Sequence, residues 1–372
     1  MGGEKERETE RRVKVLMDWA VTEGIFPGGV ALWGSRTHLR GEVAAGRLWT
    51  VPPPLGPLLS TETMFDLASL TKPLVTGALA LLSVMKGGLD LSSTVQEVLV
   101  ESRGSWVGGA TVREILTHSA GLCAWAPLYE GMETGWPLAE RKRVLLERIV
   151  ALPPVSARRE KSIYSDFGFI LLGWMLEQIW GKPLDALYRE WIALPLEIES
   201  ADFLVPASPL MEEVHSGRLK VAATEIDPDT GRPFVGVVHD EHARILSGVS
   251  GHAGLFGSAR AVWSLARPWV GGRFFSSDWL ELFRLRQDHL EWTLGWDTPT
   301  SGSSSGRFMT PGGSIGHLGY AGTSVWIDWK RDRIVVLLTN RVHPVRTNNR
   351  IREFRPLLHD AILEHWAERG SV

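Results

Sequence analysis

The chain has 372 residues, enough for one large domain or two closely packed ones. Its composition, 44% hydrophobic and 22% charged, is that of a soluble globular protein, and its net charge of -3 gives no indication of a nucleic acid or an anionic membrane as a partner. A single cysteine, Cys123, excludes an internal disulfide framework and a cysteine-rich zinc site.

The N-terminal ten residues carry charges of both signs and lack the apolar segment of a secretory signal. No uninterrupted apolar run elsewhere reaches the length of a membrane span. We therefore expect a cytoplasmic protein without a membrane partner.

The first part of the chain predicts one helix followed by strands. Residues 11–23 have apolar side chains at helical spacing, so they predict an amphipathic helix. A short apolar strand is expected over residues 28–34 and a second strand over residues 38–45. Residues 50–60 contain four prolines and predict a loop.

In the middle of the chain, apolar residues recur mostly at helical spacing. A capping-box pattern begins at Thr111, and further helices are expected over residues 138–150 and 167–180. Residues 204–250 are rich in glycine, proline and histidine, so we expect an irregular segment that forms a wall of a cleft.

The C-terminal part returns to strands. We expect strands over residues 289–296, 323–329 and 333–340, a hairpin turn at residues 328–332, and a closing helix over residues 351–366. Strands at both ends of the chain with helices between them favour an α/β (α+β) fold, in which both termini build one sheet.

The predicted organisation is a single catalytic unit over residues 1–372. Its α/β part would cover about residues 1–65 and 290–372, and its inserted helical part about residues 66–289. A cleft is expected where the two parts meet.

The most informative stretch is residues 65–82, where apolar side chains recur at helical spacing and predict one buried face. These apolar residues are Leu70, Leu74, Val75, Ala78, Leu79 and Leu82. Ser69 stands at the N-terminal end and Lys72 follows three residues later, so both side chains share one side of the first turn. A partly desolvated lysine can accept the serine proton or pass it on, and the helix N-terminus suits a developing oxyanion. Alone, this spacing is also common on solvated helix faces.

Tyr164 and Asp166 lie two residues apart in a loop before a strongly apolar helix. A phenol near an ammonium group can lose its proton more easily and act as a general base. The alternative is that Tyr164 packs in the core and Asp166 caps the helix.

His317 is expected at the start of a strand, with glycines around it that let a ligand approach the backbone. The N–H of Tyr320 could point at an acyl oxygen as a second oxyanion donor, beside the N–H of Ser69.

Taken together, three motifs resemble, in order and rough spacing, those of the serine β-lactamase and penicillin-binding protein superfamily. They are Ser69-x-x-Lys72, Tyr164-x-Asp166 and His317-x-Gly319. The likeness is strongest to class C β-lactamases and their related esterases and D-aminopeptidases, and it covers nearly the whole chain. Residues 116–122 and 248–256 also look similar to that family. The resemblance implies a β-lactamase-like antiparallel sheet flanked by helices.

The resemblance also implies roles for individual residues. Ser69 would be the nucleophile that forms an acyl-enzyme, and Lys72 its proton partner. Tyr164 would be the base for acylation, would activate water for deacylation and would protonate the leaving group. The remaining positions are expected to bind substrate or support the oxyanion: Asp166, His317, Gly319 and Tyr320.

Three departures from the family pattern bear on the substrate. Asp166 stands where members often have asparagine, and an ionised carboxylate would hold Lys72 charged and favour Tyr164 as the base. His317 replaces the lysine of β-lactamases and is expected to be only partly charged near neutrality. Leu318 replaces a hydroxyl residue. These departures favour esters, or amides without the carboxylate of a β-lactam.

Two G-x-S-x-G strings, at residues 302–306 and 312–316, lie outside the strand–turn–helix context of a nucleophile elbow, so an α/β-hydrolase is disfavoured. We interpret His118 as a buried structural residue and Cys123 as a small buried hydrophobe.

Residues 239–242, with the sequence His-Asp-Glu-His, could bind zinc together with His215 or His252. We instead interpret this stretch as a polar loop at the edge of the cleft, and we expect no metal or cofactor.

The sequence therefore predicts a serine hydrolase that acts through an acyl-enzyme on small esters or amides, with muropeptide-like molecules among the candidates. One alternative is a D,D-peptidase or weak β-lactamase acting on peptidoglycan fragments or β-lactams. Another is a binding or sensor protein of the same fold without turnover.

Overall fold

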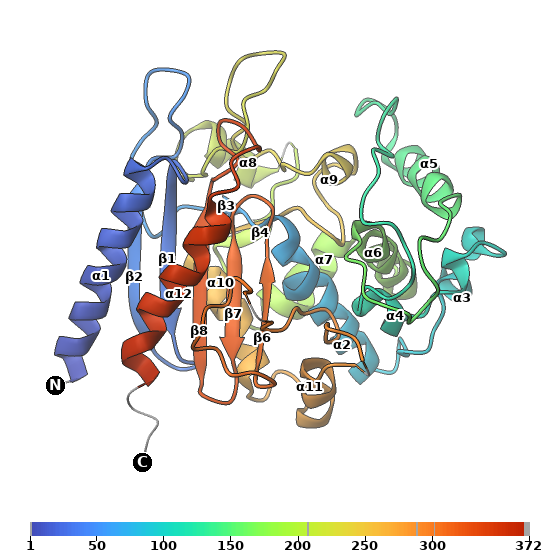
Figure 1. Ribbon diagram of the computed structural model, residues 1–372. Helices are drawn as coiled ribbons and strands as arrows, with labels where there is room; N and C mark the ends of the chain where they lie inside the picture. The colour runs from blue at the N-terminus through green and yellow to red at the C-terminus, as the bar shows by residue number, and fades with distance from the viewer. Residues whose placement is uncertain (1, 207, 288, 301, 368–372) are drawn as a thin grey trace.

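Both ends of the chain build one antiparallel sheet (Figure 1). The computed structural model describes residues 2–206, 208–287, 289–300 and 302–367. The strand order is β2-β1-β8-β7-β6, so two N-terminal strands lie beside three C-terminal ones. The strands are β1 (Gly28–Gly34), β2 (Leu39–Gly46), β6 (Ser314–Leu318), β7 (Ser324–Asp328) and β8 (Arg333–Thr339). This arrangement confirms the predicted fold class.

Helices cover both faces of the sheet. The terminal helices α1 (Gly2–Thr22) and α12 (Ile351–Ala367) contact each other on one face, and α10 (Ala259–Val270) packs on the other (Figure 1). Successive residues of β8 alternate between the two cores: Val335 lies with the terminal helices and Val336 with α10. Burial on both faces explains why this strand reads as a continuous apolar run.

The middle of the chain forms a mostly helical part, most of which lies at the right of Figure 1, and a small three-stranded sheet of order β3-β5-β4. Its helices are α2 (Ala78–Met85), α3 (Val95–Val98), α4 (Val112–Leu116), α5 (Leu138–Val150), α6 (Asp166–Trp180), α7 (Leu184–Tyr188), α8 (Pro209–His215), α9 (Glu241–Ile245) and α11 (Ser277–Arg284). Its strands are β3 (Phe65–Asp66), β4 (Ala201–Phe203) and β5 (Leu255–Gly257).

The stretch predicted as one helix over residues 65–82 is less regular than expected. It begins as β3, makes a 3₁₀ turn over Ala68–Leu70, and continues as a π-helical segment over Lys72–Gly77 before α2. Pro73 lacks an N–H and cannot take part in the ordinary helical ladder, while its carbonyl accepts a wider hydrogen bond from Ala78.

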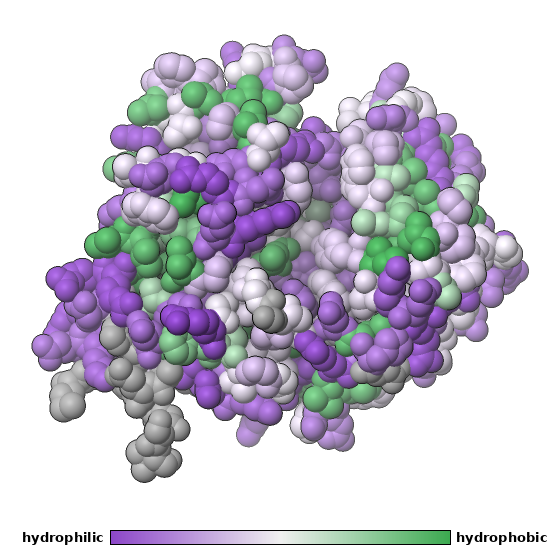
Figure 2. All heavy atoms as spheres, in the orientation of Figure 1, coloured by the Kyte–Doolittle hydropathy of each residue, from purple (hydrophilic) through white to green (hydrophobic). Residues whose placement is uncertain are grey.

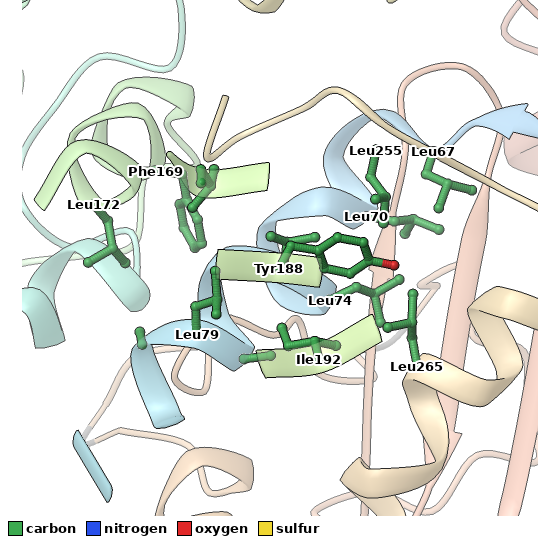
Figure 3. Close-up of a cluster of buried hydrophobic side chains, with 14 of the residues drawn as sticks. Leu67, Leu70, Leu74, Leu79, Phe169, Leu172, Tyr188, Ile192, Leu255 and Leu265 are labelled. Carbon is green, nitrogen blue, oxygen red and sulfur yellow. The ribbon is translucent and has the colours of Figure 1, made fainter. Parts of the chain in front are cut away.

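The predicted buried face of this stretch is confirmed. All six apolar positions are at least nine-tenths buried. In Figure 3, Leu70, Leu74 and Leu79 point into a cluster that also includes Tyr188 and Leu255. Burying each such leucine contributes about 1.5–3 kcal/mol, so the segment that carries Ser69 and Lys72 is anchored along its length.

Two segment predictions are wrong. Residues 204–250 are not wholly irregular, because they contain α8 and α9. The described residues 289–296 form turns rather than a strand: the Thr293 N–H donates to the Trp296 carbonyl, and Gly295 takes a φ of 93°. Leu294 and Trp296 are fully buried, so the apolar pattern reflects packing rather than strand pairing.

The 18-residue stretch Ala68–Met85 meets the length and composition of a membrane span, which the sequence analysis did not anticipate. It lies inside the protein, with 89% of that stretch buried, as the core helix of a globular protein does.

Candidate active site

Ser69 directly follows the turn that leads out of β3. Asp66 Oδ1 accepts a hydrogen bond from the Ala68 N–H at 2.8 Å, and Asp66 Oδ2 accepts one from the His239 N–H at 2.7 Å. Ala68 takes a φ of 48°, a conformation that residues with a side chain seldom adopt. The buried Asp66 carboxylate therefore holds a strained turn that fixes the position of Ser69.

Lys72 connects the groups of the site. Its Nζ atom donates to Ser69 Oγ at 2.9 Å, to Asp166 Oδ1 at 2.6 Å and to the His252 carbonyl at 3.1 Å. The side chain is fully buried. Since an ammonium group has three donors, these contacts account for all of them.

The loop before α6 brings Tyr164 and Asp166 to Lys72. Ser165, the residue between them, donates its N–H to His118 Nδ1 at 3.1 Å and its hydroxyl to the Cys123 carbonyl at 2.7 Å. His118 is thus buried and hydrogen-bonded as predicted, whereas the Cys123 side chain is only partly buried. Asp166 does not cap α6 but is its first helical residue.

Tyr164 lies beside Lys72, whose Nζ atom is 4.9 Å from the centroid of the phenol ring. Burial opposes a charge on Lys72, but attraction by Asp166 and Tyr164 outweighs it and raises the pKa of Lys72 above its ordinary value. Burial raises the pKa of Tyr164 more strongly than the Lys72 charge lowers it. The expectation that Asp166 keeps Lys72 charged agrees with this result. The prediction that Tyr164 loses its proton more easily is wrong for the resting site.

His317 lies near the end of β6, as its fourth residue, rather than at the start of a strand as predicted, because Gly319 and the residues after it form the hairpin turn to β7. Its Nδ1 atom bonds with the Leu318 carbonyl at 2.9 Å, so Nε2 is the unprotonated nitrogen of the neutral ring. Burial and the nearby Lys72 charge lower the pKa of His317 to about 3. The ring is therefore neutral near pH 7 rather than partly charged.

Aromatic rings surround Tyr164. Its ring centroid lies 4.5 Å from that of His118, 5.6 Å from Trp292 and 5.9 Å from His317. This apolar enclosure accounts for the desolvation of the phenol. Trp292 could not be predicted from the sequence as a residue of the site, because the segment that contains it has no recognisable motif.

The turn between β6 and β7 lies against the chain before Ser69. The Thr323 hydroxyl donates to the Leu67 carbonyl at 3.0 Å, and a Cβ atom on Gly319 would lie 2.6 Å from that carbonyl oxygen. Only glycine fits there. Among the described residues, the N–H groups of Ser69 and Tyr320 donate to no protein acceptor, so both are available to a substrate oxygen.

Asp240, His242 and His252 bring their possible ligand atoms within 4.8 Å of one another, and neither His239 nor His215 belongs to this group. Asp240 Oδ1 and His252 Nε2 are hydrogen-bonded at 2.7 Å. Asp240 Oδ1 also accepts from the Ala243 N–H at 2.8 Å, as the N-cap of α9. His239 and Asp240 precede α9, but Glu241 and His242 are its first residues and the side chains of both histidines are buried, so the prediction of a polar loop is only partly correct.

The two G-x-S-x-G strings do not form nucleophile elbows. Ser304 lies in a loop and accepts a hydrogen bond from Trp326 Nε1, and Ser314 is buried in β6.

The face shown in Figure 2 is largely hydrophilic and has a recess between the part that carries the sheet and the helical part. Tyr320 and Trp125 are among the large apolar side chains on the surface, with 52% and 47% of their areas exposed. Ser69 keeps part of its surface open, whereas Lys72 behind it is closed off.

The fold and the Ser69–Lys72–Tyr164 arrangement define a serine hydrolase of the β-lactamase fold. The model of the Beta-lactamase family matches residues 31–358. The chain therefore belongs to the Beta-lactamase family.

Curated relatives have a consistent description. A putative D-alanyl-D-alanine carboxypeptidase of Salmonella agona (strain SL483) is 29% identical over 322 residues, covering 79% of this chain and 73% of the relative. A protein of the same description from Escherichia coli O157:H7 is 29% identical over 313 residues, covering 76% and 70%.

Solved structures show the same fold. EstCE1, a hydrolase with promiscuous acyltransferase activity, aligns with a TM-score of 0.75 at 22% identity, covering 96% of this chain and 99% of its own. Unliganded simvastatin synthase (LovD) from Aspergillus terreus aligns with a TM-score of 0.75 at 18% identity, covering 98% and 99%. SurE aligns with a TM-score of 0.70 at 22% identity, covering 99% and 77%.

Proposed function

We propose that this protein hydrolyses small carboxylic esters, and amides without a free carboxylate, through an acyl-enzyme on Ser69. The observation that carries the proposal is the hydrogen bond from Lys72 Nζ to Ser69 Oγ at 2.9 Å, together with the Tyr164 ring, whose centroid lies 4.9 Å from the same Nζ atom. A nucleophile, a fixed positive charge and a titratable phenol are thereby placed next to one another.

The contacts of Lys72 assign the proton-transfer steps. A lysine that is charged and donates to three acceptors has no lone pair with which to accept the Ser69 proton. Tyr164, once ionised, accepts that proton as Ser69 Oγ attacks the substrate carbonyl, and then returns it to the leaving group. In deacylation Tyr164 accepts a proton from the attacking water, and that proton goes to Ser69 Oγ as the acyl bond breaks.

The negative charge that develops on the substrate carbonyl oxygen needs donors that are already in place. Two N–H groups at the junction of β3 and the β6–β7 turn, those of Ser69 and Tyr320, have no acceptor among the described residues. Such preorganised donors commonly supply the largest single electrostatic contribution to acyl transfer.

The surroundings of the site support the choice of substrate. His317 is neutral and Leu318 has no hydroxyl, so this strand offers no fixed charge to a substrate carboxylate. The Lys72 donors are all engaged within the protein. An uncharged ester or amide avoids the need for such a partner.

The relatives described as D-alanyl-D-alanine carboxypeptidases favour a second candidate, an amide substrate that ends in a free carboxylate. Turnover of p-nitrophenyl acetate, nitrocefin and a D-alanyl-D-alanine peptide by the same preparation separates these candidates. We expect ester turnover to exceed the other two by at least about tenfold, which corresponds to 1.4 kcal/mol of transition-state discrimination. Equal or greater peptide turnover would favour the carboxypeptidase. Acylation without release of product would favour the sensor protein.

A further inference from the structure

Arg355, on the buried side of α12, is a charged residue to which the proposed chemistry assigns no role. Only 5% of its surface is exposed, and none of the ion pairs among the described residues includes it. Burial lowers the pKa of Arg355 to about 9, with further lowering from neighbouring arginines, so the guanidinium is still charged at neutral pH. A buried charge without an acidic partner is costly, and its retention calls for an explanation.

The contacts of Arg355 lead to the turn between β6 and β7. Its Nη2 atom donates to the Thr323 carbonyl at 3.0 Å and to the Gly319 carbonyl at 3.3 Å. The Thr323 carbonyl also accepts from the Gly319 N–H at 2.8 Å, which closes the turn. The Arg355 guanidinium, on α12, therefore bonds the first and last residues of the turn, Gly319 and Thr323.

The Gly319 carbonyl belongs to the same peptide group as the Tyr320 N–H. In a trans peptide the C=O and N–H bonds lie in one plane and point in opposite directions. The Gly319 oxygen accepts from the Gly322 N–H at 3.0 Å and from the Arg355 guanidinium at 3.3 Å, and these two bonds fix the direction of the Tyr320 N–H on the other side of the plane. The positive charge also polarises this peptide group, which strengthens the N–H as a donor.

Two further contacts hold the turn against the Ser69 segment. Arg341 Nη2 donates to the Tyr320 carbonyl at 2.6 Å, which orients the next peptide group. The Thr323 hydroxyl bonds the Leu67 carbonyl, two residues before Ser69. One hydrogen-bonded network therefore holds the N–H groups of Ser69 and Tyr320 in a fixed position relative to each other. Arg355 contributes a positive charge to this network from the side of α12.

We propose that Arg355 is a positioning residue of the oxyanion site, which aims and polarises the Tyr320 N–H through the Gly319 carbonyl. The proposal rests on the proposed function, because it requires an acyl oxygen to bind that N–H during turnover. It assigns to α12, which is remote in sequence from Ser69, a part in transition-state binding.

The test compares Arg355→Gln, which removes the charge, with Arg355→Lys, which keeps the charge but lacks the planar guanidinium group with its paired N–H donors. Arg352→Gln is the matched control, because Arg352 lies on the same helix and is exposed. Each variant is assayed for kcat and KM with p-nitrophenyl acetate and for inhibition by phenylboronic acid, whose tetrahedral adduct on a serine places an oxygen in the oxyanion site. Thermal unfolding reports on folding.

For Arg355→Gln we expect kcat to fall about 10- to 100-fold with KM within about twofold, since loss of a whole oxyanion donor costs about 10²–10³ in kcat. Boronate affinity should fall in proportion to kcat, Arg355→Lys should be intermediate, and Arg352→Gln should match wild type. A folded Arg355→Gln with wild-type kcat would overturn the proposal. So would a fall in kcat with unchanged boronate affinity, which is the signature of a merely structural role.

If Arg355→Gln does not fold, the comparison of Arg355→Lys with wild type decides, and unchanged kcat and boronate affinity would overturn the proposal. Ser69→Ala separates this inference from the function on which it rests. Turnover that survives Ser69→Ala would refute the proposed function itself. Turnover that depends on Ser69 but not on Arg355 would refute only the inference.

Discussion

The Asp166 carboxylate controls the protonation of the site, and Asp166→Asn tests this directly. In the wild type the carboxylate bonds Lys72 Nζ at 2.6 Å and raises the pKa of Lys72; its charge also raises the pKa of Tyr164. Asparagine keeps an oxygen that can accept the Lys72 hydrogen bond but removes the charge. The pKa of both groups should therefore fall, whichever of them acts as the base.

The magnitude follows from the proximity of the charges. An opposite charge at contact distance shifts a pKa by about 1–3 units, which corresponds to about 1.4–4 kcal/mol. In the wild type, the raised pKa of Tyr164 predicts that kcat/KM for p-nitrophenyl acetate rises with pH above neutrality, as the base ionises. In Asp166→Asn this rising limb should move to lower pH, because Tyr164 loses a nearby like charge that raises its pKa.

The measurement is the pH profile of kcat/KM, with Asp185→Asn as the matched control. Asp185 pairs with Arg189 through a partly buried contact along one helical turn outside the site, so its loss removes the same charge without touching Lys72. A limb that stays in place in Asp166→Asn, or moves to higher pH, would refute the assignment of Asp166. A shift in both variants would attribute the effect to net charge alone.

Four further variants probe separate parts of the account. Tyr164→Phe should lower kcat about 10²- to 10⁴-fold without loss of the folded state, measured by ester turnover and circular dichroism; near-normal turnover would remove Tyr164 from proton transfer. Gly319→Ala should lower kcat, because its Cβ would meet the Thr323 hydroxyl at 2.0 Å, and wild-type kinetics would show that the turn need not stay in place. His317→Lys should raise nitrocefin turnover relative to ester turnover by supplying a fixed charge, and an unchanged ratio would argue against the carboxylate explanation. Burial raises the pKa of Glu225, but hydrogen bonds from a histidine and an arginine lower it to about 2, below the ordinary 4.5. Its stabilisation is present above pH 4.5 and lost as the pH falls toward 2, so Glu225→Gln should unfold at a higher pH in acid titration, and an unchanged midpoint would contradict this.

Much of the architecture could be predicted because local patterns coincide with the final packing. The expected strand over residues 28–34 and the expected helix over residues 138–150 match β1 and α5 in their bounds. The capping box that begins at Thr111 forms as the pattern predicts. In each case the periodicity and the end signals are contained in the segment itself.

The errors arise where tertiary contacts decide the structure. The apolar run at residues 289–296 folds as turns, because Leu294 and Trp296 are buried by distant elements rather than by a neighbouring strand. The π-helical segment after Ser69 includes a hydrogen bond from the Ala78 N–H to the Pro73 carbonyl, which the spacing of apolar residues does not predict.

The candidate site, too, could be predicted only in part from the sequence. The residue types at Ser69, Lys72 and Tyr164 could be recognised, and the structure brings these three together. The neutral state of His317 could not be predicted, since it depends on complete burial and on a nearby charge supplied by another element. Trp292 and the remaining contacts around the phenol were beyond prediction for the same reason.

The most direct test of the central claim is intact-mass spectrometry after treatment with a fluorophosphonate, beside p-nitrophenyl acetate hydrolysis, for wild type and Ser69→Ala. We predict one covalent adduct on the wild type, located at Ser69, with both the adduct and the turnover lost in the variant. An unmodified wild type, together with unchanged turnover in Ser69→Ala, would contradict the acyl-enzyme mechanism.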